Sequence, residues 1–373
     1  MKKIVLAFDS FKGSLTSQQV AEAFEEGLRS RLPDCAIKKV PIADGGEGTL
    51  QALVSVTGGE LLSCRATDPL GRPIVATYGV VGQTAIMDLA TTSGLALLQP
   101  DERNPLQTTT YGFGQMLLNA IERGCRRFLI GIGGSATNDG GTGLLSALGY
   151  RFIDNSGNPL DGCGASLASI VSIDASGRNI HLDNCSFEVA CDVVNPLFGE
   201  RGAAYVYAPQ KGADAAMVTL LDKGLQNYGQ LLNYYCGRDI SNVPGAGAAG
   251  GVGAALAALL NAKMVRGVDM ILDAIDFDNI IDGADYVVTG EGRIDEQTMM
   301  GKAPYGVLER ARSRGVPVIA VGGSVADSVA AGNSAFFKTI SATPPGMPLS
   351  TAVQPEVAKE NIRNAAARLA GIL

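Results

Sequence analysis

The stretch Ile4-Val5-Leu6-Ala7-Phe8-Asp9-Ser10-Phe11-Lys12-Gly13 decides the class of fold, because a short apolar run passes directly into a turn of carboxylate and glycine. The same pattern recurs at residues 40–49, 128–141 and 286–295. Such apolar runs are typical of buried strands in a parallel α/β sheet. The carboxyl ends of parallel strands share one edge of a sheet, and ligands bind in the crevice outside it. We therefore expect these turns to converge.

The turns combine two kinds of ligand-binding group. Glycine allows backbone amides to approach phosphate oxygens, and carboxylates suit a divalent cation. Together they predict a magnesium-dependent phosphoryl-transfer site. The P-loop pattern G-x-x-x-x-G-K-[ST] is absent both at Gly13 and at Gly301-Lys302, so a bound nucleotide would be held by another arrangement.

The composition excludes several classes of protein. A net charge of −7 argues against nucleic acid or an anionic membrane as the main partner. Scattered cysteines and a single histidine, His181, argue against a zinc site and against histidine-based catalysis. No apolar run reaches the roughly 18 residues of a membrane span or forms a signal peptide. We expect a reduced, cytoplasmic protein and leave its oligomeric state open, a homodimer included.

The order of apolar patterns predicts an α/β fold with two domains. A βαβα pattern begins the chain and resumes near the end with strand 285–289, helix 303–314, strands 316–321 and 335–341 and a final helix at 355–371. Between them, residues 60–90 are typical of an antiparallel hairpin, and similar short runs recur at 186–194 and 203–208. We predict a Rossmann or flavodoxin-like parallel-sheet domain formed by residues 1–64 and 284–373, and an inserted α/β domain at 65–283. The segment 125–150 could belong to either domain.

Two glycine segments are candidates for binding an anion. Gly133, Gly134 and Ser135 follow a predicted strand and precede a predicted helix, as a phosphate- or substrate-binding turn requires. Gly245, Gly247 and Gly250 match the dinucleotide pattern G-x-G-x-x-G, but no convincing strand precedes them, which disfavours NAD binding. An anion-binding loop that opens helix 252–262 and simple close packing of the backbone remain the alternatives there.

Charged residues at the turns supply the remaining candidates. The carboxylates are Asp44 and Glu47 in one turn, Asp192 after the run 187–191, and Glu291 and Asp295, which flank Arg293 on a predicted loop beyond strand 285–289. Each carboxylate could instead cap a helix. The lysines at such turns are Lys12, Lys211 and Lys302, and a solvated surface lysine is the alternative for each.

Seven motifs resemble, in order and spacing, the bacterial glycerate kinase family, and the resemblance covers essentially the full chain. The motifs are residues 9–15, 44–49, 133–141, 192–197, 209–212, 245–251 and 289–298. The resemblance implies ATP-dependent phosphorylation of D-glycerate, and the members that this chain most resembles make 2-phosphoglycerate. It also implies a flavodoxin-like domain with an inserted α/β domain. It assigns no secure role to individual residues.

The chemistry of the side chains suggests how the roles divide. We expect Gly133, Gly134, Ser135 and the loop with Gly245, Gly247 and Gly250 to receive ATP phosphates in an interdomain cleft. Asp192 and Asp295 are the candidates for binding Mg²⁺ or for acting as the base, and Glu291 is the third candidate catalytic residue, supporting them. The candidates for binding glycerate are Lys12, Asp44, Glu47 and Arg293.

Three other functions remain open from the residues. A kinase of this kind could form 3-phosphoglycerate instead, because the residues do not distinguish the C2 from the C3 hydroxyl. An NAD-dependent hydroxy-acid dehydrogenase would use residues 245–250. A non-catalytic sugar-acid sensor would keep the anion-binding turns without needing several carboxylates.

Overall fold

The computed structural model describes the chain except residues 1, 41, 43–52, 55–56 and 331–334. The chain forms two compact units: unit 1 is Met1–Asp44, Ser55–Thr57 and Val268–Leu373, and unit 2 is Gly45–Val54 and Gly58–Gly267. The division near residue 267 differs from the predicted boundary at 283. The reason is that helices α9 (Gly267–Ala274) and α10 (Phe277–Ile281) associate with α11 (Ala303–Ser313), whose Arg310 pairs with Asp273 and Asp278.

Unit 1 is built on a five-stranded sheet in which every neighbouring pair is parallel. Its order is β13-β12-β11-β1-β2, where β1 is Lys3–Phe8, β2 Ala36–Lys39, β11 Tyr286–Ile294, β12 Val318–Val325 and β13 Lys338–Ser341. Numbered within the unit, this order is 2-1-3-4-5, which is that of flavodoxin. The predicted flavodoxin-like fold is therefore confirmed.

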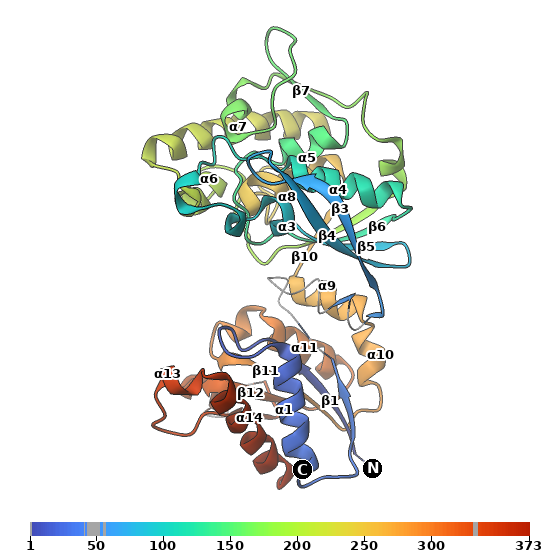
Figure 1. Cartoon of the computed structure of the whole chain (residues 1–373), viewed down its shortest axis with the longest axis vertical. Coiled ribbons are helices and arrows are strands. Elements are labelled where there is room, and N and C mark those ends of the chain that lie inside the picture. The colour runs from blue at the N-terminus through green and yellow to red at the C-terminus, as the bar shows by residue number, and fades with distance from the viewer. Residues whose placement is uncertain (1, 41, 43–52, 55–56, 331–334) are drawn as a thin grey trace. The chain divides into compact units, whose positions relative to one another are not determined.

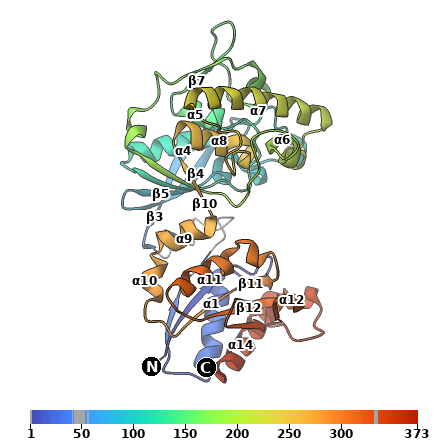
Figure 2. The same cartoon turned by 180° about the vertical axis from the view of Figure 1, so that it is seen from behind.

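Helices cover both faces of this sheet, as its continuous apolar strands require. α1 (Ser17–Arg29) and α14 (Pro355–Ala370) pack together against one face, where Phe8 contacts Phe24 (Figure 1). α11 contacts β1, β11 and β12 from the other face (Figure 2). α1 begins with a capping box of Thr16 and Gln19. The short helices α12 (Asp327–Ala330) and α13 (Leu349–Ala352) complete the unit.

The prediction of a glycine-loosened loop after residue 289 is wrong. β11 continues to Ile294, and Glu291 and Arg293 lie opposite Gly322 and Ser324 of β12. Gly290 serves strand packing, because a Cβ there would lie 2.0 Å from the carbonyl oxygen of Val321. The glycine therefore allows two strands to approach closely rather than freeing the chain.

Unit 2 is built on a six-stranded mixed sheet in the order β10-β9-β6-β5-β4-β3. The strands are β3 (Glu60–Thr67), β4 (Pro73–Val81), β5 (Thr84–Asp88), β6 (Arg127–Gly131), β9 (Ser186–Ala190) and β10 (Lys263–Val265). β3, β4 and β5 are antiparallel neighbours, which confirms the hairpin, whereas β5, β6, β9 and β10 are parallel. A separate antiparallel pair is formed by β7 (Arg151–Ile153) and β8 (Ser172–Asp174).

The helices with both ends in the described part of unit 2 include α3 (Ala90–Ser93), α4 (Tyr111–Glu122), α5 (Thr142–Ala147), α6 (Ala203–Tyr207), α7 (Ala215–Cys236) and α8 (Ala248–Leu259). The strand-like interpretation of 203–208 is wrong: this run is α6, whose Ala203 and Ala204 are buried and which packs against α7 and α8. The run at 186–194 does contain a strand, β9, but a parallel one.

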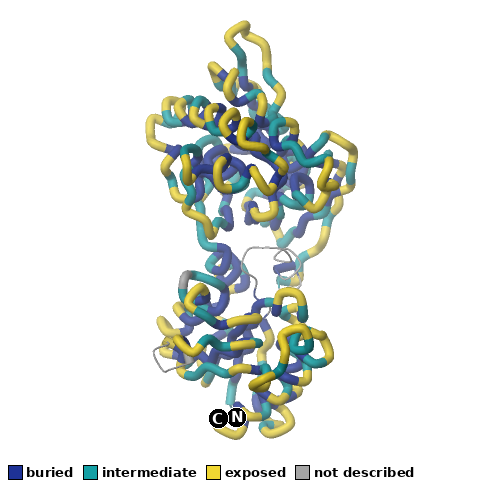
Figure 3. Tube along the Cα trace, turned by 90° about the vertical axis from the view of Figure 1, so that its left-hand side faces the viewer, coloured by how far each residue is buried: buried dark blue, intermediate teal, exposed yellow. Residues whose placement is uncertain are grey.

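Buried residues concentrate on the strands and on the helix faces next to them, and exposed residues lie at the periphery of each unit (Figure 3). Among the described residues, no helix combines the length and the apolar character needed to cross a membrane.

Candidate active site

The predicted turns do not all follow strands of one sheet, so the expectation that they share one sheet edge is wrong. Residues 9–13 follow β1 and residue 295 follows β11 in unit 1, whereas residues 133–141 follow β6 in unit 2. Asp44 and Glu47 lie outside the described residues. Each unit therefore carries its own set of candidate residues.

Unit 1 contains a cavity of about 570 Å³ at the carboxyl ends of its strands. The turn after β1 contributes Ser10 and Lys12, β11 contributes Glu291 and Arg293, and α13 and α14 contribute an apolar wall. In a sheet of order 2-1-3-4-5, the strand order reverses between the first and third strands, here β1 and β11, and ligands bind at that point. The cavity thus occupies the expected ligand position of the fold.

Glu291 is the buried carboxylate of this cavity, with 8% of its surface exposed. Its Oε1 accepts a hydrogen bond from the hydroxyl of Thr298 at 2.7 Å, and its Oε2 accepts one from the ammonium group of Lys302 at 3.2 Å. Lys302 also lines the cavity, together with Lys12 and Arg293. Lys302 is consequently an ion-paired residue rather than a solvated surface lysine, and the cavity carries a cationic lining suited to an anionic ligand.

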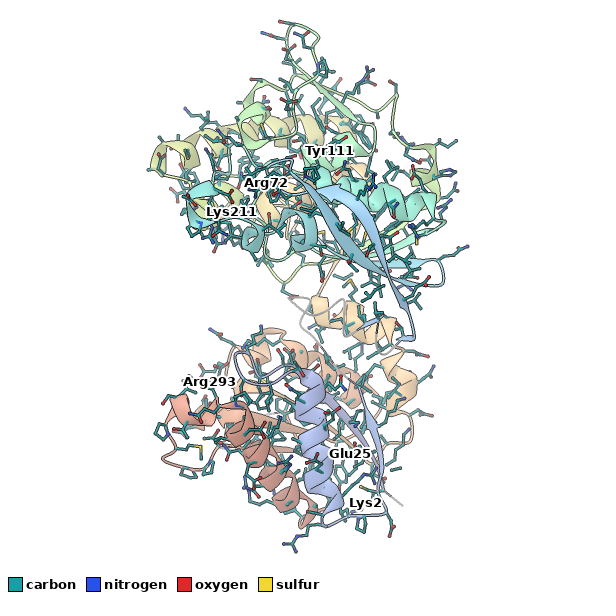
Figure 4. The ribbon with its side chains drawn as sticks, in the orientation of Figure 1. Lys2, Glu25, Arg72, Tyr111, Lys211 and Arg293 are labelled. Carbon is teal, nitrogen blue, oxygen red and sulfur yellow. The ribbon has the colours of Figure 1, made fainter. Side chains whose placement is uncertain are left out.

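Asp295 lies directly after β11 and is connected to Glu291 through Thr298. Its backbone amide donates to the Thr298 hydroxyl at 3.0 Å, the same hydroxyl that donates to Glu291. The Asp295 carboxylate accepts a hydrogen bond from the amide of Gln297 at 3.0 Å and lies 3.3 Å from Nε of Arg293. Arg293 itself is largely exposed (Figure 4). The structure therefore brings three predicted residues together, and it adds the buried Thr298, which no sequence pattern singled out.

In unit 2, Gly133 and Gly134 are exposed on the turn after β6. Gly134 has a φ of 70°, a conformation that favours glycine. A Cβ at Gly133 would meet nothing within 4 Å. Within the described part of the chain, no hydrogen bond uses the amide of either residue. Both amides can therefore face a ligand, as phosphate binding requires.

Lys211, labelled in Figure 4, contacts this turn and has 2% of its surface exposed. Its ammonium group donates to the carbonyl oxygen of Thr137 at 2.6 Å and lies 3.4 Å from the hydroxyl of Ser135. Burial lowers the pKa of Lys211 to about 7, although the carboxylate of Asp139 acts in the opposite direction. The alternative of a solvated surface lysine is wrong here, because Lys211 supports the turn from inside.

Asp139 is fully buried, and all its recorded hydrogen bonds go to protein groups. Its Oδ2 accepts from the amide and hydroxyl of Thr110, at 2.8 and 2.7 Å, and from the amide of Gly143, while Oδ1 accepts from the amide of Gly141. Burial raises the pKa of this carboxyl, and these hydrogen bonds oppose the rise. Because the donors stand at the starts of α4 and α5, Asp139 fixes two helix N-termini to the turn.

The glycines of the 245–250 loop serve close packing. A Cβ at Gly247 would lie 2.2 Å from the carbonyl oxygen of Pro196, and one at Gly250 would lie 2.1 Å from that of Thr137. Gly245 is similarly crowded by the thiol of Cys191 at 2.6 Å. The amide of Gly247 already donates to Asn195. These contacts favour close backbone packing over anion binding for this loop. The loop packs against the 133–141 turn, where the amide of Gly140 donates to the carbonyl oxygen of Gly250.

Asp192 follows β9, the neighbour of β6, and is exposed. One of its carboxylate oxygens accepts a hydrogen bond at 3.0 Å from the amide of Gly267, the first residue of α9. Helix capping is therefore one role of this residue. In the described part of the chain, no three His, Cys, Asp or Glu side chains form a cluster that could hold a metal ion.

Comparisons with known proteins show which family the chain resembles. The family model described as the glycerate kinase family matches residues 4–373. The chain is 46% identical to glycerate kinase of Bacillus cereus, over 99% of this chain and 97% of that one. It is 44% identical to glycerate 2-kinase of Escherichia coli K12, over 88% of this chain and 86% of that one. A crystal structure from Salmonella typhimurium LT2, provisionally named glycerate kinase 2, has a TM-score of 0.89 and 42% identity, covering 100% of this chain and 98% of that one.

The match extends over both units and includes every turn described above. A flavodoxin-like sheet with a cationic cavity at its switch point is consistent with phosphorylation of a small acid. The chain therefore belongs to the glycerate kinase family and is an enzyme.

Proposed function

We propose that this enzyme transfers the γ-phosphate of ATP to the C2 hydroxyl of D-glycerate, giving 2-phosphoglycerate. The observation that carries the proposal is the cavity at the switch point of unit 1, which Lys12, Arg293 and Lys302 line and in which Lys302 contacts the buried Glu291. Phosphoryl transfer depends mainly on positioning and on neutralising charge, so a site without histidine is adequate.

The surroundings of each residue suggest its role. Lys12 and Arg293 line the cavity and would bind the carboxylate of glycerate, whereas the contact of Lys302 with Glu291 gives it a supporting position. The amides of Gly133 and Gly134, with Ser135, would receive phosphate oxygens. Asp44 and Glu47 remain substrate-binding candidates on the sequence pattern alone.

Asp192 in unit 2 and Asp295 in unit 1 are separate candidates for binding Mg²⁺, each proposed on its side-chain chemistry. Their chemistry fits, because Mg²⁺ in phosphate-transferring sites is commonly held by one or two carboxylates while the phosphates and water supply its other ligands. A cluster of three or more carboxylate side chains is not needed. The cation would neutralise charge on the phosphates of the bound nucleotide.

The base that orients or deprotonates the attacking hydroxyl is Asp295 or Asp192 in this proposal. Glu291 is less suited, because the hydroxyl of Thr298 and the ammonium group of Lys302 each occupy one of its oxygens. We assign Glu291 the role of holding Lys302 and Thr298 in place. Thr298 in turn accepts the hydrogen bond that fixes the backbone of Asp295.

The other candidate functions lack a comparable observation. NAD binding at residues 245–250 would need an open glycine turn after a strand, but Gly245, Gly247 and Gly250 are buried and crowded. A sensor would not need the linked carboxylates Glu291 and Asp295. Formation of 3-phosphoglycerate differs from the proposal in the position of the hydroxyl alone, and product analysis distinguishes the two.

A thermal-unfolding titration tests the function directly, since a ligand that binds the folded state raises its melting temperature. We expect ATP with Mg²⁺ to raise the melting temperature and NAD to leave it unchanged. Incubation with ATP, Mg²⁺ and D-glycerate should then produce ADP at a rate that requires glycerate. Stabilisation by NAD alone, or ATP binding without glycerate-dependent ADP formation, would contradict the kinase.

A further inference from the structure

The cavity of unit 1 has two chemically different ends. The charged residues gather where β1 and β11 end, whereas α13, α14 and the segment before them contribute Met347, Ala352, Ala358 and Ile362. The volume of about 570 Å³ lies within the range of roughly 300–1,000 Å³ that is typical for larger organic ligands. Glycerate, a charged three-carbon acid, would fill little of this space and has no apolar group for the α13–α14 wall.

One polar side chain interrupts this apolar wall. Asn361 lies on α14 among buried apolar residues, lines the cavity, and has 6% of its surface exposed. Its Nδ2 donates to the thioether of Met347 at 3.4 Å, which is a weak acceptor. No hydrogen bond recorded for the described residues uses its Oδ1. A buried amide normally has stronger partners than a thioether, so the amide of Asn361 can still bond to a ligand in the cavity.

We propose that this end of the cavity is the nucleobase subsite, that it takes the adenine ring of an adenine nucleotide, and that Asn361 determines the specificity for adenine. An asparagine amide presents one donor and one acceptor side by side. This pair complements the ring nitrogen N7 and the amino group on the neighbouring carbon of adenine. Guanine presents two acceptors at the same edge, so it cannot form both bonds.

The apolar side chains and the charged end complete this assignment. Met347 and Ile362 suit the faces of a flat ring, since thioether and aliphatic groups pack well against aromatic surfaces. The phosphates would extend toward the charged end of the cavity, where Glu291 holds Lys302 in place. The assignment rests on the proposed function, because it requires ATP as the phosphate donor. It adds the place where the adenine ring binds and the residue that recognises it, Asn361.

Calorimetric titration with ADP tests the subsite without any turnover. In Asn361→Leu, the ADP dissociation constant should rise at least tenfold, and Ala352→Phe, which fills the apolar end, should raise it as well. Asn364→Leu is the matched control, because Asn364 lies one turn further along α14, is exposed and bonds to Glu360. This control should bind ADP as the unmodified protein does.

Kinetics with ATP and GTP test the specificity. Asn361→Leu should raise KM for ATP about as much as the ADP dissociation constant, leave KM for glycerate unchanged, and reduce the preference for ATP over GTP. Unchanged ADP binding in both Asn361→Leu and Ala352→Phe, or no ADP binding by the unmodified protein, would overturn the subsite. If ADP binding depends on Asn361 but no glycerate is phosphorylated, the subsite stands and the proposed function fails.

Discussion

Unit 1 and unit 2 each place a carboxylate and a lysine near the carboxyl end of a parallel strand, yet the two arrangements differ in burial. In unit 1, Glu291 and Lys302 are in contact and both line a cavity. In unit 2, Asp139 is fully buried and Lys211 is 2% exposed. The same residue types therefore face a ligand site in one unit and hold the scaffold of a glycine turn in the other.

The difference follows from the cost of burying a charge. A buried charge is destabilising unless hydrogen bonds replace its lost hydration, and removing its partners is expensive. Asp139 meets this requirement with two helix N-termini and the hydroxyl of Thr110. Glu291 keeps access to the cavity, where a ligand can contribute. Substitution of Asp139 in unit 2 should therefore lower the free energy of unfolding. Substitution of a cavity residue in unit 1 should instead change ligand binding or turnover.

The largest effect is expected for Asp139→Ala. It would leave the Thr110 hydroxyl and the amides of Thr110, Gly141 and Gly143 without their acceptor, at a cost of about 3–5 kcal/mol in the free energy of unfolding. Urea unfolding measures this change. The control Asp101→Ala, at an exposed position, should stay within about 0.5 kcal/mol of the unmodified protein. A cost below about 1 kcal/mol for Asp139→Ala would contradict the scaffold role.

Asp295→Asn in unit 1 should reduce activity without reducing stability, the opposite of Asp139→Ala. The variant keeps an oxygen for the amide of Gln297 but loses its charge, so the melting temperature should stay nearly unchanged while kcat falls by on the order of 10². Steady-state kinetics and thermal unfolding give both quantities. Glu296→Gln, the exposed neighbour, is the control and should retain kcat. If Asp295→Asn turns over at a nearly normal rate, Asp295 does not belong to the site.

The sequence predicted much of the architecture because apolar runs report burial directly. β1 and the 60–90 hairpin were both predictable from local patterns. The length of β11 was not, because Gly290 and Gly292 look like loop residues, and the need for glycine at position 290 arises from the neighbouring β12.

The candidate site was only partly predictable, because contacts between residues far apart in the sequence leave no local pattern. Lys12, Glu291 and Arg293, which were candidates from the sequence, line one cavity, although Glu291 and Arg293 lie on β11 rather than on a turn. Asp139, Lys211 and Thr298 owe their importance to burial and to partners far away in the sequence, such as Thr110 for Asp139. A local pattern cannot show that the glycines at 245–250 are crowded by Pro196 and Thr137.

Gly133→Ala tests whether the glycine turn of unit 2 binds a substrate, and its effect should be smaller than that of Asp295→Asn. Because a Cβ at Gly133 meets no protein atom within 4 Å, the variant should fold normally, and any functional change reports a ligand that approaches the turn. We expect KM for ATP to rise about tenfold, or roughly 1.4 kcal/mol. Gly371→Ala, at another uncrowded position, serves as the control. Unchanged KM values for both ATP and glycerate would mean that the turn binds neither substrate.

The smallest effect concerns the pH dependence of stability. Because the pKa of Lys211 is about 7 in the folded chain and 10.5 ordinarily, the unfolded chain binds more protons between these values. The free energy of unfolding should therefore rise with pH across that window, by about 1 kcal/mol between pH 7.5 and 8.5. Lys211→Met should remove this rise, and Lys223→Met, at an exposed position on α7, should keep it. An identical pH profile in Lys211→Met and the unmodified protein would contradict a buried lysine of low pKa.

Phosphorus NMR of the reaction of ATP, Mg²⁺ and D-glycerate tests the central claim most directly. A phosphate on C2 couples to a single proton and gives a doublet, whereas a phosphate on the C3 methylene gives a triplet. We predict a doublet for the new phosphomonoester, in keeping with transfer to the hydroxyl beside the carboxylate. A dominant triplet would contradict the assignment to C2, and the absence of any new phosphomonoester signal with either enantiomer of glycerate would contradict the kinase itself.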